Sequence, residues 1–268
     1  MKLKDKVAIV TGSAQNVGEE IAKLFAFEGA KVIVVDINDK KGNEVKNKII
    51  ENGGEAIFVN CNVIDTEEVK KLISTAINKY KKIDILVNNV GNGVLSKITD
   101  QTLEEWRNTI DLTVTSAFLC SKHALEEMMK NKDGGIIVNI ASIDGLIGEY
   151  GYPSYNAGKA AMINLTRNIA LDYAMYNIRA NAICPGPIEP SEQGQSAEKI
   201  SLFKDIEAIV KHQLEAIPMG RKCKPIEVAK AALFLASNDS SYITATTLVV
   251  DGGLLGYSGL GKLSQLLR

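Results

Sequence analysis

The sequence VAIVTGSAQNVGEE, residues 7–20, decides the fold, because an apolar run turns abruptly into a stretch with helical spacing. The run is rich in β-branched residues, which are typical of a buried strand, and Gly12 allows the chain to turn where that strand ends. Gly18 lets the following helix approach the sheet closely. Free backbone N–H groups and the helix dipole favour a bound phosphate at such a turn. A glycine-rich turn that binds no ligand has the same sequence pattern, so the turn alone does not distinguish a phosphate site from an ordinary turn.

Asn16 stands where a phosphate-binding turn of this kind would carry a further glycine. Asparagine tolerates a left-handed backbone better than most residues, so we expect the turn to survive the substitution. The amide side chain would then lie near the pyrophosphate or ribose of a dinucleotide. Val17, between Asn16 and Gly18, belongs to the same candidate site.

Asp36 ends the next apolar run, KVIVVD, about twenty residues after the turn. A carboxylate there can accept hydrogen bonds from the ribose hydroxyls of NAD and would repel the 2′-phosphate of NADP. Neither Gln15, Asn16 nor Ile37 supplies a cation for that phosphate, so we expect NAD in preference to NADP. A solvated acid, or a cap for the helix that begins near residues 38–39, is the alternative interpretation.

Similar apolar runs recur along the chain and predict seven strands, beginning at residues 7, 31, 56, 83, 135, 178 and 247. Stretches with helical periodicity separate them, at about residues 19–29, 41–53, 66–80, 103–130 and 155–176. Alternating strands and helices predict an α/β fold with a doubly wound parallel sheet of Rossmann type. We expect one domain over residues 1–268, with a polar helical insertion at about 189–217 and a tail at 254–268.

The composition excludes several classes of function. Lys and Arg number 31 against 32 for Asp and Glu, so there is no electrostatic footprint for nucleic acid or an anionic membrane. The four cysteines have no CxxC spacing, and we expect neither a metal site nor a disulfide framework. No uncharged run reaches the about 18 residues of a membrane span, and the first apolar run is too short for a signal peptide. We therefore expect a cytoplasmic protein that acts on a small molecule.

The stretch SIDGLIGEYGYPSYNAGK, residues 142–159, carries the candidate chemistry. Tyr155 and Lys159 are four residues apart on a predicted helix, so their side chains share one face. An ammonium near a phenol favours the phenolate, and we expect Lys159 to lower the pKa of Tyr155 so that it can exchange a proton with a substrate oxygen. Ser142, at the end of a predicted strand, can donate a hydrogen bond to the same oxygen. A YxxxK pair by itself is usually a pair of surface residues on a helix. Here a serine at a strand end and a phosphate turn accompany the pair, and they favour a catalytic role.

Together these residues resemble the short-chain dehydrogenase/reductase family, from Lys6 to about Gly253. The resemblance rests on TGSAQNVG at 11–18, Asp36, NNVG at 88–91, the Ser142, Tyr155 and Lys159 set, CPGPI at 184–188 and VVDGG at 249–253. It implies hydride transfer between the carbon of an alcohol or carbonyl substrate and nicotinamide. In that reaction Tyr155 would be the acid/base, Ser142 would orient the substrate oxygen, and Lys159 would hold the nicotinamide ribose.

The resemblance also implies the cofactor contacts, which are Gly12, Asn16, Val17, Gly18, Asp36, Asn62, Val63, Asn89, Tyr155, Lys159, Pro185, Gly186 and Ile188. Asn62 and Val63 match the positions that face the adenine. Asn89 matches the residue whose backbone lies along the cofactor. The segment from 185 to 188 matches the one beside the nicotinamide carboxamide.

Thr113 is the sharpest departure from the family pattern. Aligned on Trp106 and Phe118, it stands where the family has a catalytic Asn that holds a water linking the lysine to solvent. A Thr hydroxyl can hold a water but is shorter, so we expect the proton relay to pass through Thr113 or a rearranged water chain. Pro190, where the family has Thr, removes a hydroxyl and an N–H from the carboxamide contacts.

The loops expected above the sheet, at about 92–100, 143–152 and 189–217, are polar. Their polarity favours a hydroxyl-rich substrate, and Glu149 is a candidate contact for it. Loops that are merely solvated have the same composition. A 3-oxoacyl reductase is the alternative enzyme. Such reductases usually take NADPH, and Asp36 argues against this cofactor because its carboxylate would repel the 2′-phosphate. A dinucleotide-binding protein without turnover is the alternative of another class.

The resemblance implies a homotetramer, or a dimer, assembled through the helix at 103–130, the Tyr155 helix and the last strand. From the sequence alone, those apolar faces could equally be buried in the core of one chain. The tail is expected to cover a neighbouring subunit's site or interface, with a frayed end as the alternative.

Overall fold

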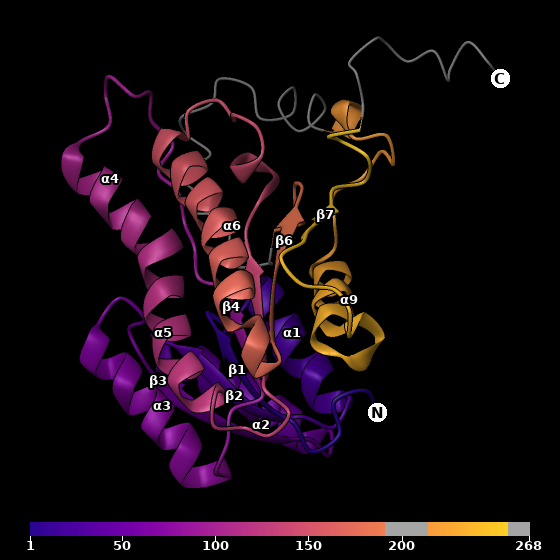
Figure 1. The fold of residues 1–268 in the computed structure, drawn as a ribbon. Helices are drawn as coiled ribbons and strands as arrows, with labels where there is room; N and C mark the ends of the chain where they lie inside the picture. Colours follow the sequence, from indigo (N-terminus) through magenta and orange to yellow (C-terminus); the bar gives the residue numbers. More distant parts are fainter. Residues whose placement is uncertain (191–213, 257–268) are drawn as a thin grey trace, which may run out of the picture.

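The computed structural model describes residues 1–190 and 214–256, and within them seven parallel strands form one sheet (Figure 1). The strands are β1 (Val7–Thr11), β2 (Lys31–Asp36), β3 (Glu55–Asn60), β4 (Ile85–Asn88), β5 (Gly135–Ile140), β6 (Ile178–Pro185) and β7 (Thr247–Val250). Their order across the sheet is β3-β2-β1-β4-β5-β6-β7. In the pairing register, Ala8 of β1 lies beside Val32 of β2 and Ile85 of β4. The predicted seven strands and Rossmann-type sheet are confirmed.

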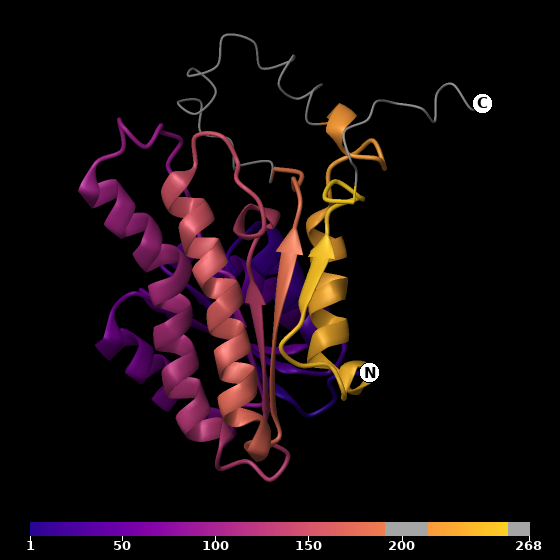
Figure 2. The ribbon, with the colours of Figure 1, turned by 45° about the horizontal axis from the view of Figure 1, so that its top comes forward.

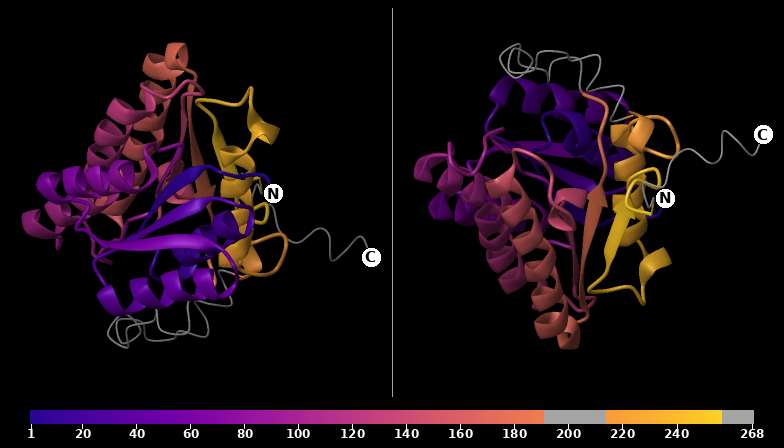
Figure 3. Two further views of the ribbon diagram at one scale, coloured as in Figure 1. Left: turned by 90° about the horizontal axis from the view of Figure 1, so that it is seen from below. Right: turned by 90° about the horizontal axis from the view of Figure 1, so that it is seen from above.

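Helices cover both faces of the sheet, as Figure 2 and Figure 3 show. One face carries α1 (Asn16–Phe27), α2 (Asp39–Glu51) and α9 (Pro225–Ala236), and the other carries α3 (Thr66–Tyr80), α5 (Ser116–Met128) and α6 (Pro153–Tyr173). Successive strand residues point to opposite faces, so Val10 lies in the core beside α1 whereas Ile9 lies in the core beside α3. Burial on both faces explains why the strands are nearly continuous apolar runs.

The reversal of strand order between β2, β1 and β4 positions the candidate site. In open parallel sheets a crevice forms outside the carboxyl ends of the strands at such a point. The phosphate turn follows β1, Asp36 ends β2, Asn89 follows β4, and Ser142 follows β5. Residues scattered through the sequence therefore meet at one edge of the sheet. The predicted insertion at 189–217 and tail at 254–268 fall mostly outside the described residues, at 191–213 and 257–268.

The prediction of one continuous regular helix over residues 103–130 is wrong, because the helix is interrupted. Helix α4 (Leu103–Ile110) and helix α5 are joined by a π-helical turn at Asp111–Thr115. The Thr113 hydroxyl donates to the Thr109 carbonyl oxygen at 2.6 Å, a side-chain bond to the preceding turn that competes with regular helix geometry. Gly158 on α6 leaves room for this widened turn, since a Cβ there would lie 2.0 Å from Thr113 Oγ1. Such turns are frequent at functional sites.

Helix α9 is an element that the sequence analysis did not predict. It begins with Pro225 at its first turn, and the Glu227 carboxylate accepts a hydrogen bond from the Lys224 backbone N–H at 2.8 Å. Its apolar residues are buried on most sides of the helix, so the usual helical alternation is weak.

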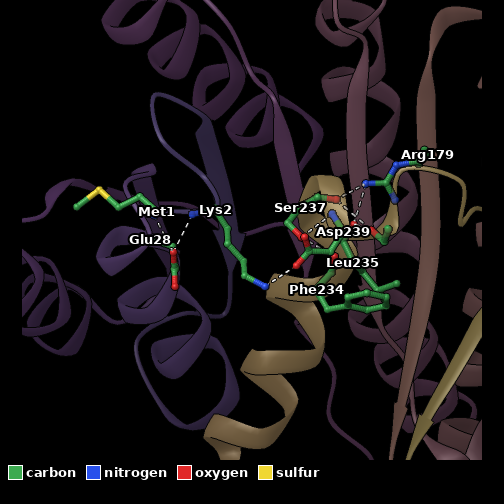
Figure 4. A network of polar contacts seen from close by, with 9 residues as sticks. Met1, Lys2, Glu28, Arg179, Phe234, Leu235, Ser237 and Asp239 are labelled. Atoms are coloured by element: carbon green, nitrogen blue, oxygen red, sulfur yellow. Dashed lines mark hydrogen bonds and ion pairs between the residues drawn. The ribbon is translucent and has the colours of Figure 1, made fainter.

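Arg179 of β6 holds the carboxyl end of α9 against the sheet (Figure 4). Its guanidinium donates to the carbonyl oxygens of Leu235, Ser237 and Ile243 at 3.0 to 3.1 Å. Burial lowers the pKa of Arg179, but an arginine stays charged at neutral pH and favours the negative end of the helix dipole. The neighbouring ion pair of Lys2 and Asp239 is exposed, and such surface pairs contribute little to stability.

Candidate active site

A cavity of about 820 Å³ opens at the edge of the sheet where the strand ends meet. It is lined by many of the predicted site residues, namely Val17, Asn89, Ser142, Tyr155, Lys159, Pro185, Gly186 and Ile188. The other predicted residues, which are Gly12, Asn16, Gly18, Asp36, Asn62, Val63 and Thr113, lie outside this lining. The cavity thus runs from the start of α1 to the Ser-Tyr-Lys group. One elongated ligand could reach both.

The turn after β1 is built by contacts that need glycine. Gly12 has φ +61°, in the left-handed region, and a Cβ on Gly18 would lie 2.2 Å from the Gly12 carbonyl oxygen. The Asn89 side chain fastens the turn to β4, because its Nδ2 donates to the carbonyl oxygens of Thr11 at 3.1 Å and Gly12 at 3.0 Å. The Asn89 backbone N–H also donates to Thr11 Oγ1 at 3.0 Å, so both the side-chain N–H groups and the backbone N–H of Asn89 are committed to the turn.

Asn16 has φ +49°, so the predicted left-handed backbone is confirmed. Its side-chain Oδ1 is buried and has no hydrogen-bond partner among the described residues. Gln15, the residue before α1, makes no side-chain cap, whereas Asn38 caps α2 and Asp65 caps α3. A buried amide oxygen without a partner and open helix N–H groups fit the ribose hydroxyls and phosphates of a dinucleotide.

Asp36 lies beside this turn and is tied to it. Its Oδ2 accepts from the Ala14 backbone N–H at 3.1 Å, and its Oδ1 accepts from the Asn38 N–H at 3.0 Å. Lys41 also lies here, although no motif points to it. Its Nζ donates to Gln15 Oε1 at 3.1 Å and so brings a cation to the same end of the site. The signal was available in principle, because Asn38 caps α2 and places Lys41 in the first helical turn.

The two predicted adenine-facing residues follow β3 at the same edge of the sheet. The Cys61 N–H donates to the Asp36 carbonyl oxygen at 3.2 Å, which keeps Asn62 close to the end of β2. The Asn62 backbone N–H donates to Glu68 at 2.7 Å, so its position is fixed by helix α3. Val63 is buried in the core, with little surface left for a ligand.

Ser142, Tyr155 and Lys159 converge on one end of the cavity. Ser142 lies just after β5, and α6 carries the other two side chains on one face. Lys159 Nζ lies 5.5 Å from the centre of the Tyr155 ring and donates to the Ile140 carbonyl oxygen at 2.7 Å. The predicted spacing thus produces the expected juxtaposition.

A line of buried amides fixes α6 on the sheet and with it the two catalytic candidates. Asn88 Nδ2 donates to Asn139 Oδ1 at 2.8 Å, and Asn139 Nδ2 donates to Thr166 Oγ1 at 2.8 Å. Asn139 is fully buried with both side-chain polar atoms hydrogen-bonded, whereas Asn88 Oδ1 is buried without a partner among the described residues. Asn88 belongs to the NNVG motif at 88–91, whereas no sequence motif points to Asn139 or Thr166.

Burial shifts the pKa values of both Tyr155 and Lys159. Burial raises the pKa of Tyr155, the Asp144 carboxylate raises it further, and a hydrogen bond from Ser142 acts in the opposite sense. Burial lowers the pKa of Lys159 to about 8. Lys159 is desolvated and hydrogen-bonded to the Ile140 carbonyl oxygen, and its lowering of the Tyr155 pKa stays a prediction.

Thr113 is fully buried behind Lys159 and does not line the cavity. A Cβ on Gly91 would lie 2.8 Å from Lys159 Nζ and 3.7 Å from Thr113 Cγ2, which places both side chains around one glycine. The Thr113 hydroxyl hydrogen is already donated to the Thr109 carbonyl oxygen. The contacts therefore point to a positioning role, and the proton relay through Thr113 stays a prediction.

The described walls of the cavity are more apolar than the loop composition predicts. Leu95, Ile147, Leu254 and Leu255 line it beside the acids of the 143–152 loop. The Asp251 carboxylate accepts from the Leu255 N–H at 2.7 Å and so folds the start of the tail against the site of its own chain. No sequence pattern indicates this apolar wall, because it joins segments that are far apart in the sequence.

The segment from 185 to 188, predicted to lie beside the nicotinamide carboxamide, is fixed by backbone hydrogen bonds to Cys223. The Cys223 N–H donates to the Pro187 carbonyl oxygen at 2.8 Å, and the Glu189 N–H donates to the Cys223 carbonyl oxygen at 2.8 Å. Pro190 follows this pairing at an exposed position. The backbone around Ile188 is thus fixed without the residue that the family has at 190.

Comparisons with known proteins agree with this geometry. A family model described as enoyl-(acyl carrier protein) reductase matches residues 12–255. The chain is 38% identical over 257 residues to glucose 1-dehydrogenase 2 of Bacillus subtilis (strain 168), covering 95% of this chain and 96% of that protein. It is 38% identical over 256 residues to a 3-oxoacyl-[acyl-carrier-protein] reductase of Synechocystis sp., covering 94% and 98%.

Among solved structures, the fold is similar to a short-chain type dehydrogenase/reductase from Mycobacterium marinum. The TM-score is 0.84 at 30% sequence identity, and the match covers 94% of this chain and 96% of the other. No helix within residues 1–190 and 214–256 combines the length and apolarity needed to cross a membrane. The chain belongs to the short-chain dehydrogenase/reductase family, whose oxidoreductases use a nicotinamide cofactor.

Proposed function

We propose that this protein is an NAD-dependent oxidoreductase that interconverts a secondary alcohol, such as a sugar or polyol hydroxyl, and the corresponding ketone. The observation that carries the proposal is the single cavity lined by Val17 at the start of α1 and by Ser142, Tyr155 and Lys159 at its other end. A dinucleotide is an elongated ligand that could reach from the start of α1 to the Ser-Tyr-Lys group. Its nicotinamide supplies the hydride acceptor or donor.

The chain's own residues supply the proton chemistry. In alcohol oxidation, the Tyr155 phenolate takes the hydroxyl proton while the carbon loses a hydride, so the alcohol gives up one proton and one hydride, which together are two hydrogens and two electrons. Ser142 donates a hydrogen bond to the substrate oxygen and holds it against Tyr155. Lys159 holds the nicotinamide ribose and, when protonated, favours the phenolate. In ketone reduction each step runs backwards.

Asp36 supports NAD as the cofactor, and its replacement tests the preference. Asp36→Asn removes the charge that would face the 2′-phosphate of NADP but keeps oxygen and nitrogen atoms for the ribose hydroxyls. A like-charge contact in a partly solvated site costs about 2 to 3 kcal/mol, so we expect the preference for NAD over NADP in kcat/KM to fall about 30-fold or more. Lys41, already at the turn, would then face the added phosphate.

Asp39→Asn is the matched control, because Asp39 is an exposed acid in the first turn of α2. Its cofactor ratio should stay within about threefold of the wild-type ratio, since exposed charges are strongly screened. Equal ratios in the wild type and in Asp36→Asn would remove Asp36 from cofactor selection.

The substrate class follows from the two kinds of wall in the cavity. Asp144 and Glu149 offer hydrogen-bond acceptors, and Leu254 and Leu255 offer an apolar face. A sugar or other polyol would use the acids, which is consistent with the name of the Bacillus relative, glucose 1-dehydrogenase 2. A ketone with an apolar flank would use the leucines.

A 3-oxoacyl reductase activity is the second candidate, and the apolar wall is the observation that favours it. The Synechocystis relative carries that name at the same identity as the glucose dehydrogenase. Asp36 argues against the NADPH that such reductases usually take. A dinucleotide-binding protein without turnover is the alternative of another class, and the complete Ser-Tyr-Lys group argues against it.

The experiment is a screen of the purified protein against sugars, polyols, hydroxy acids and acyl ketones, with NAD(H) and NADP(H), in both directions. NAD-linked oxidation of a sugar or other secondary alcohol supports the proposal. NADPH-linked reduction of a 3-oxoacyl thioester alone would support the second candidate. Cofactor binding without turnover on any compound would support the binding protein.

We further propose a homo-oligomer, a tetramer or a dimer, built on exposed apolar side chains of α5, α6 and β7. Phe118, Leu171 and Val249 are large apolar residues that the single chain leaves exposed on these elements. Sedimentation equilibrium should give two or four times the 29.0 kDa of one chain, and Leu171→Glu should lower that mass. A single-chain mass at micromolar concentration would contradict the assembly.

A further inference from the structure

Gly93 packs directly on the base of the Tyr155 side chain. A Cβ on Gly93 would lie 2.9 Å from Tyr155 Cβ and 3.0 Å from Tyr155 Cγ, which is tighter than ordinary van der Waals contact. The same Cβ would lie 3.1 Å from Tyr152 Cδ1, so the glycine contacts both tyrosines. Gly93 is buried, lines the cavity and lies outside the NNVG motif at 88–91. This close approach depends on the missing side chain at 93.

The chain before Gly93 is fixed on the sheet and on α6. The Asn89 side chain and backbone N–H are bonded to the turn after β1. A Cβ on Gly91 would lie 2.8 Å from Lys159 Nζ, so this part of the loop lies against the lysine. Asn92 Oδ1 accepts a hydrogen bond from the Gly93 backbone N–H at 3.0 Å. The loop is therefore held in place where it leaves β4.

The chain after this glycine is fastened to the segment that leads into α6. The Ser96 backbone N–H donates to the Gly151 carbonyl oxygen at 2.8 Å, and Gln101 Nε2 donates to Ser154 Oγ at 2.9 Å. A Cβ on Gly151 would lie 2.6 Å from Leu95 Cδ1, so the two segments are in close contact. A loop fixed on both sides has little freedom to move outward. A side chain at 93 would therefore push on the tyrosine and not lift the loop.

The other contacts of the Tyr155 ring lie beyond its base. Lys159 Nζ lies 5.5 Å from the ring centre, and the Tyr152 ring packs edge-on with its centre 6.3 Å away. Gly93 adds the contact at Cβ and Cγ, where the direction of the ring is set. Because the hydroxyl is at the far end of the ring, a small rotation at the base moves the hydroxyl by a larger distance. The loop backbone thus controls where the phenol oxygen lies.

We propose that Gly93 is a positioning residue for the acid/base, because its missing side chain lets the loop lie on the base of Tyr155 and hold the phenol hydroxyl in line with the substrate oxygen. This inference rests on the proposed function, in which Tyr155 exchanges a proton with that oxygen. Gly93 acts through Tyr155 and has no side chain with which to take part in the chemistry.

The first test is Gly93→Ala, measured by steady-state kinetics on the best compound of the screen. The methyl group displaces the Tyr155 hydroxyl, so we expect kcat to fall about 10- to 100-fold, as for a catalytic group about 1 Å out of place. KM and the NAD dissociation constant should stay within about threefold. In Tyr155→Phe, which has no hydroxyl to displace, adding Gly93→Ala should lower kcat by less than about threefold.

A methyl group that only narrowed the cavity would raise KM and leave kcat unchanged, and that result would overturn the proposal. Gly148→Ala is the matched control, because a Cβ at Gly148 would meet no atom within 4 Å and this glycine does not line the cavity. Its kcat should stay within about twofold of the wild-type value. An equal loss of kcat in both variants would assign the effect to loop alanines in general and contradict a specific role for Gly93.

Gln101→Met carries the kinetic test if Gly93→Ala does not fold. Methionine has a similar length but cannot donate to Ser154 Oγ, so it loosens the attachment of the loop to α6 without adding bulk. We expect kcat to fall about three- to tenfold with KM unchanged, as for the loss of one hydrogen bond that acts on the transition state. In that case, an unchanged kcat in folded Gln101→Met would overturn the proposal.

The last test needs neither substrate nor cofactor and so stands apart from the proposed function. With tyrosines labelled with ¹³C at Cζ, the NMR signal of Tyr155 is identified by its loss in Tyr155→Phe. This signal should move in Gly93→Ala, whereas that of Tyr80 on α3 should not. An unmoved Tyr155 signal in the folded variant would overturn the proposal, whatever the substrate screen gives. A moved signal in a protein that turns over no compound would support the positioning role and contradict the proposed function.

Discussion

Tyr155→Phe should lower kcat/KM about 10³-fold, which corresponds to about 4 kcal/mol of transition-state stabilisation. Phenylalanine keeps the ring that packs edge-on against Tyr152, with ring centres 6.3 Å apart, but it has no proton to exchange with the substrate oxygen. The fold and the start of α1 are untouched, so the dissociation constant for NAD should stay within about threefold. The measurement is steady-state kinetics on the best compound of the screen, together with NAD titration.

Tyr152→Phe is the matched control. Tyr152 lines the same cavity and carries the same hydroxyl, and burial raises its pKa as it does for Tyr155. Lys159 lies over the Tyr155 ring and not over that of Tyr152, so the control should lose less than about tenfold. Equal losses in the two variants would mean that the cavity needs hydroxyls in general and that Tyr155 is not the acid/base.

The sheet and the main residues of the site could be predicted because short-range patterns determine them. Strands buried on both faces leave apolar runs, and parallel strands bring the residues after β1, β2, β4 and β5 to one edge. The spacing of Tyr155 and Lys159 needs nothing beyond one regular helix. The left-handed backbone of Asn16 followed from the side chain alone.

The remaining features depend on contacts between segments that the sequence does not place together. The π-helical turn at Thr113 exists beside Gly158, a residue of another helix whose lack of a Cβ leaves the space. Leu254 and Leu255 reach the cavity because Asp251 folds the chain back. The raised pKa of Tyr155 reflects its burial and the nearby Asp144 carboxylate, neither of which a YxxxK pattern contains.

Gly18→Ala should weaken NAD binding about 100-fold, which corresponds to about 2.7 kcal/mol. The added Cβ would lie 2.2 Å from the Gly12 carbonyl oxygen, 2.7 Å from Asn89 Nδ2 and 2.8 Å from the Ser13 Cα. Two of these neighbours are backbone atoms, so the turn must open instead of a side chain swinging away. Opening it breaks the bonds from Asn89 that fasten the turn to β4 and misaligns the N–H groups at the start of α1.

Gly148→Ala provides the comparison for Gly18→Ala, because a Cβ at Gly148 would meet no atom within 4 Å. It makes the same chemical change in a loop of the same protein, so its NAD dissociation constant and Tm should stay close to those of the wild type. Gly18→Ala should also lower the free energy of unfolding by about 1 to 3 kcal/mol, since overpacking strains the backbone. Folded Gly18→Ala with an NAD dissociation constant within threefold of the wild-type value would show that the cofactor does not depend on the close approach of α1 to the turn after β1. The phosphate site would then have to be sought elsewhere along the cavity.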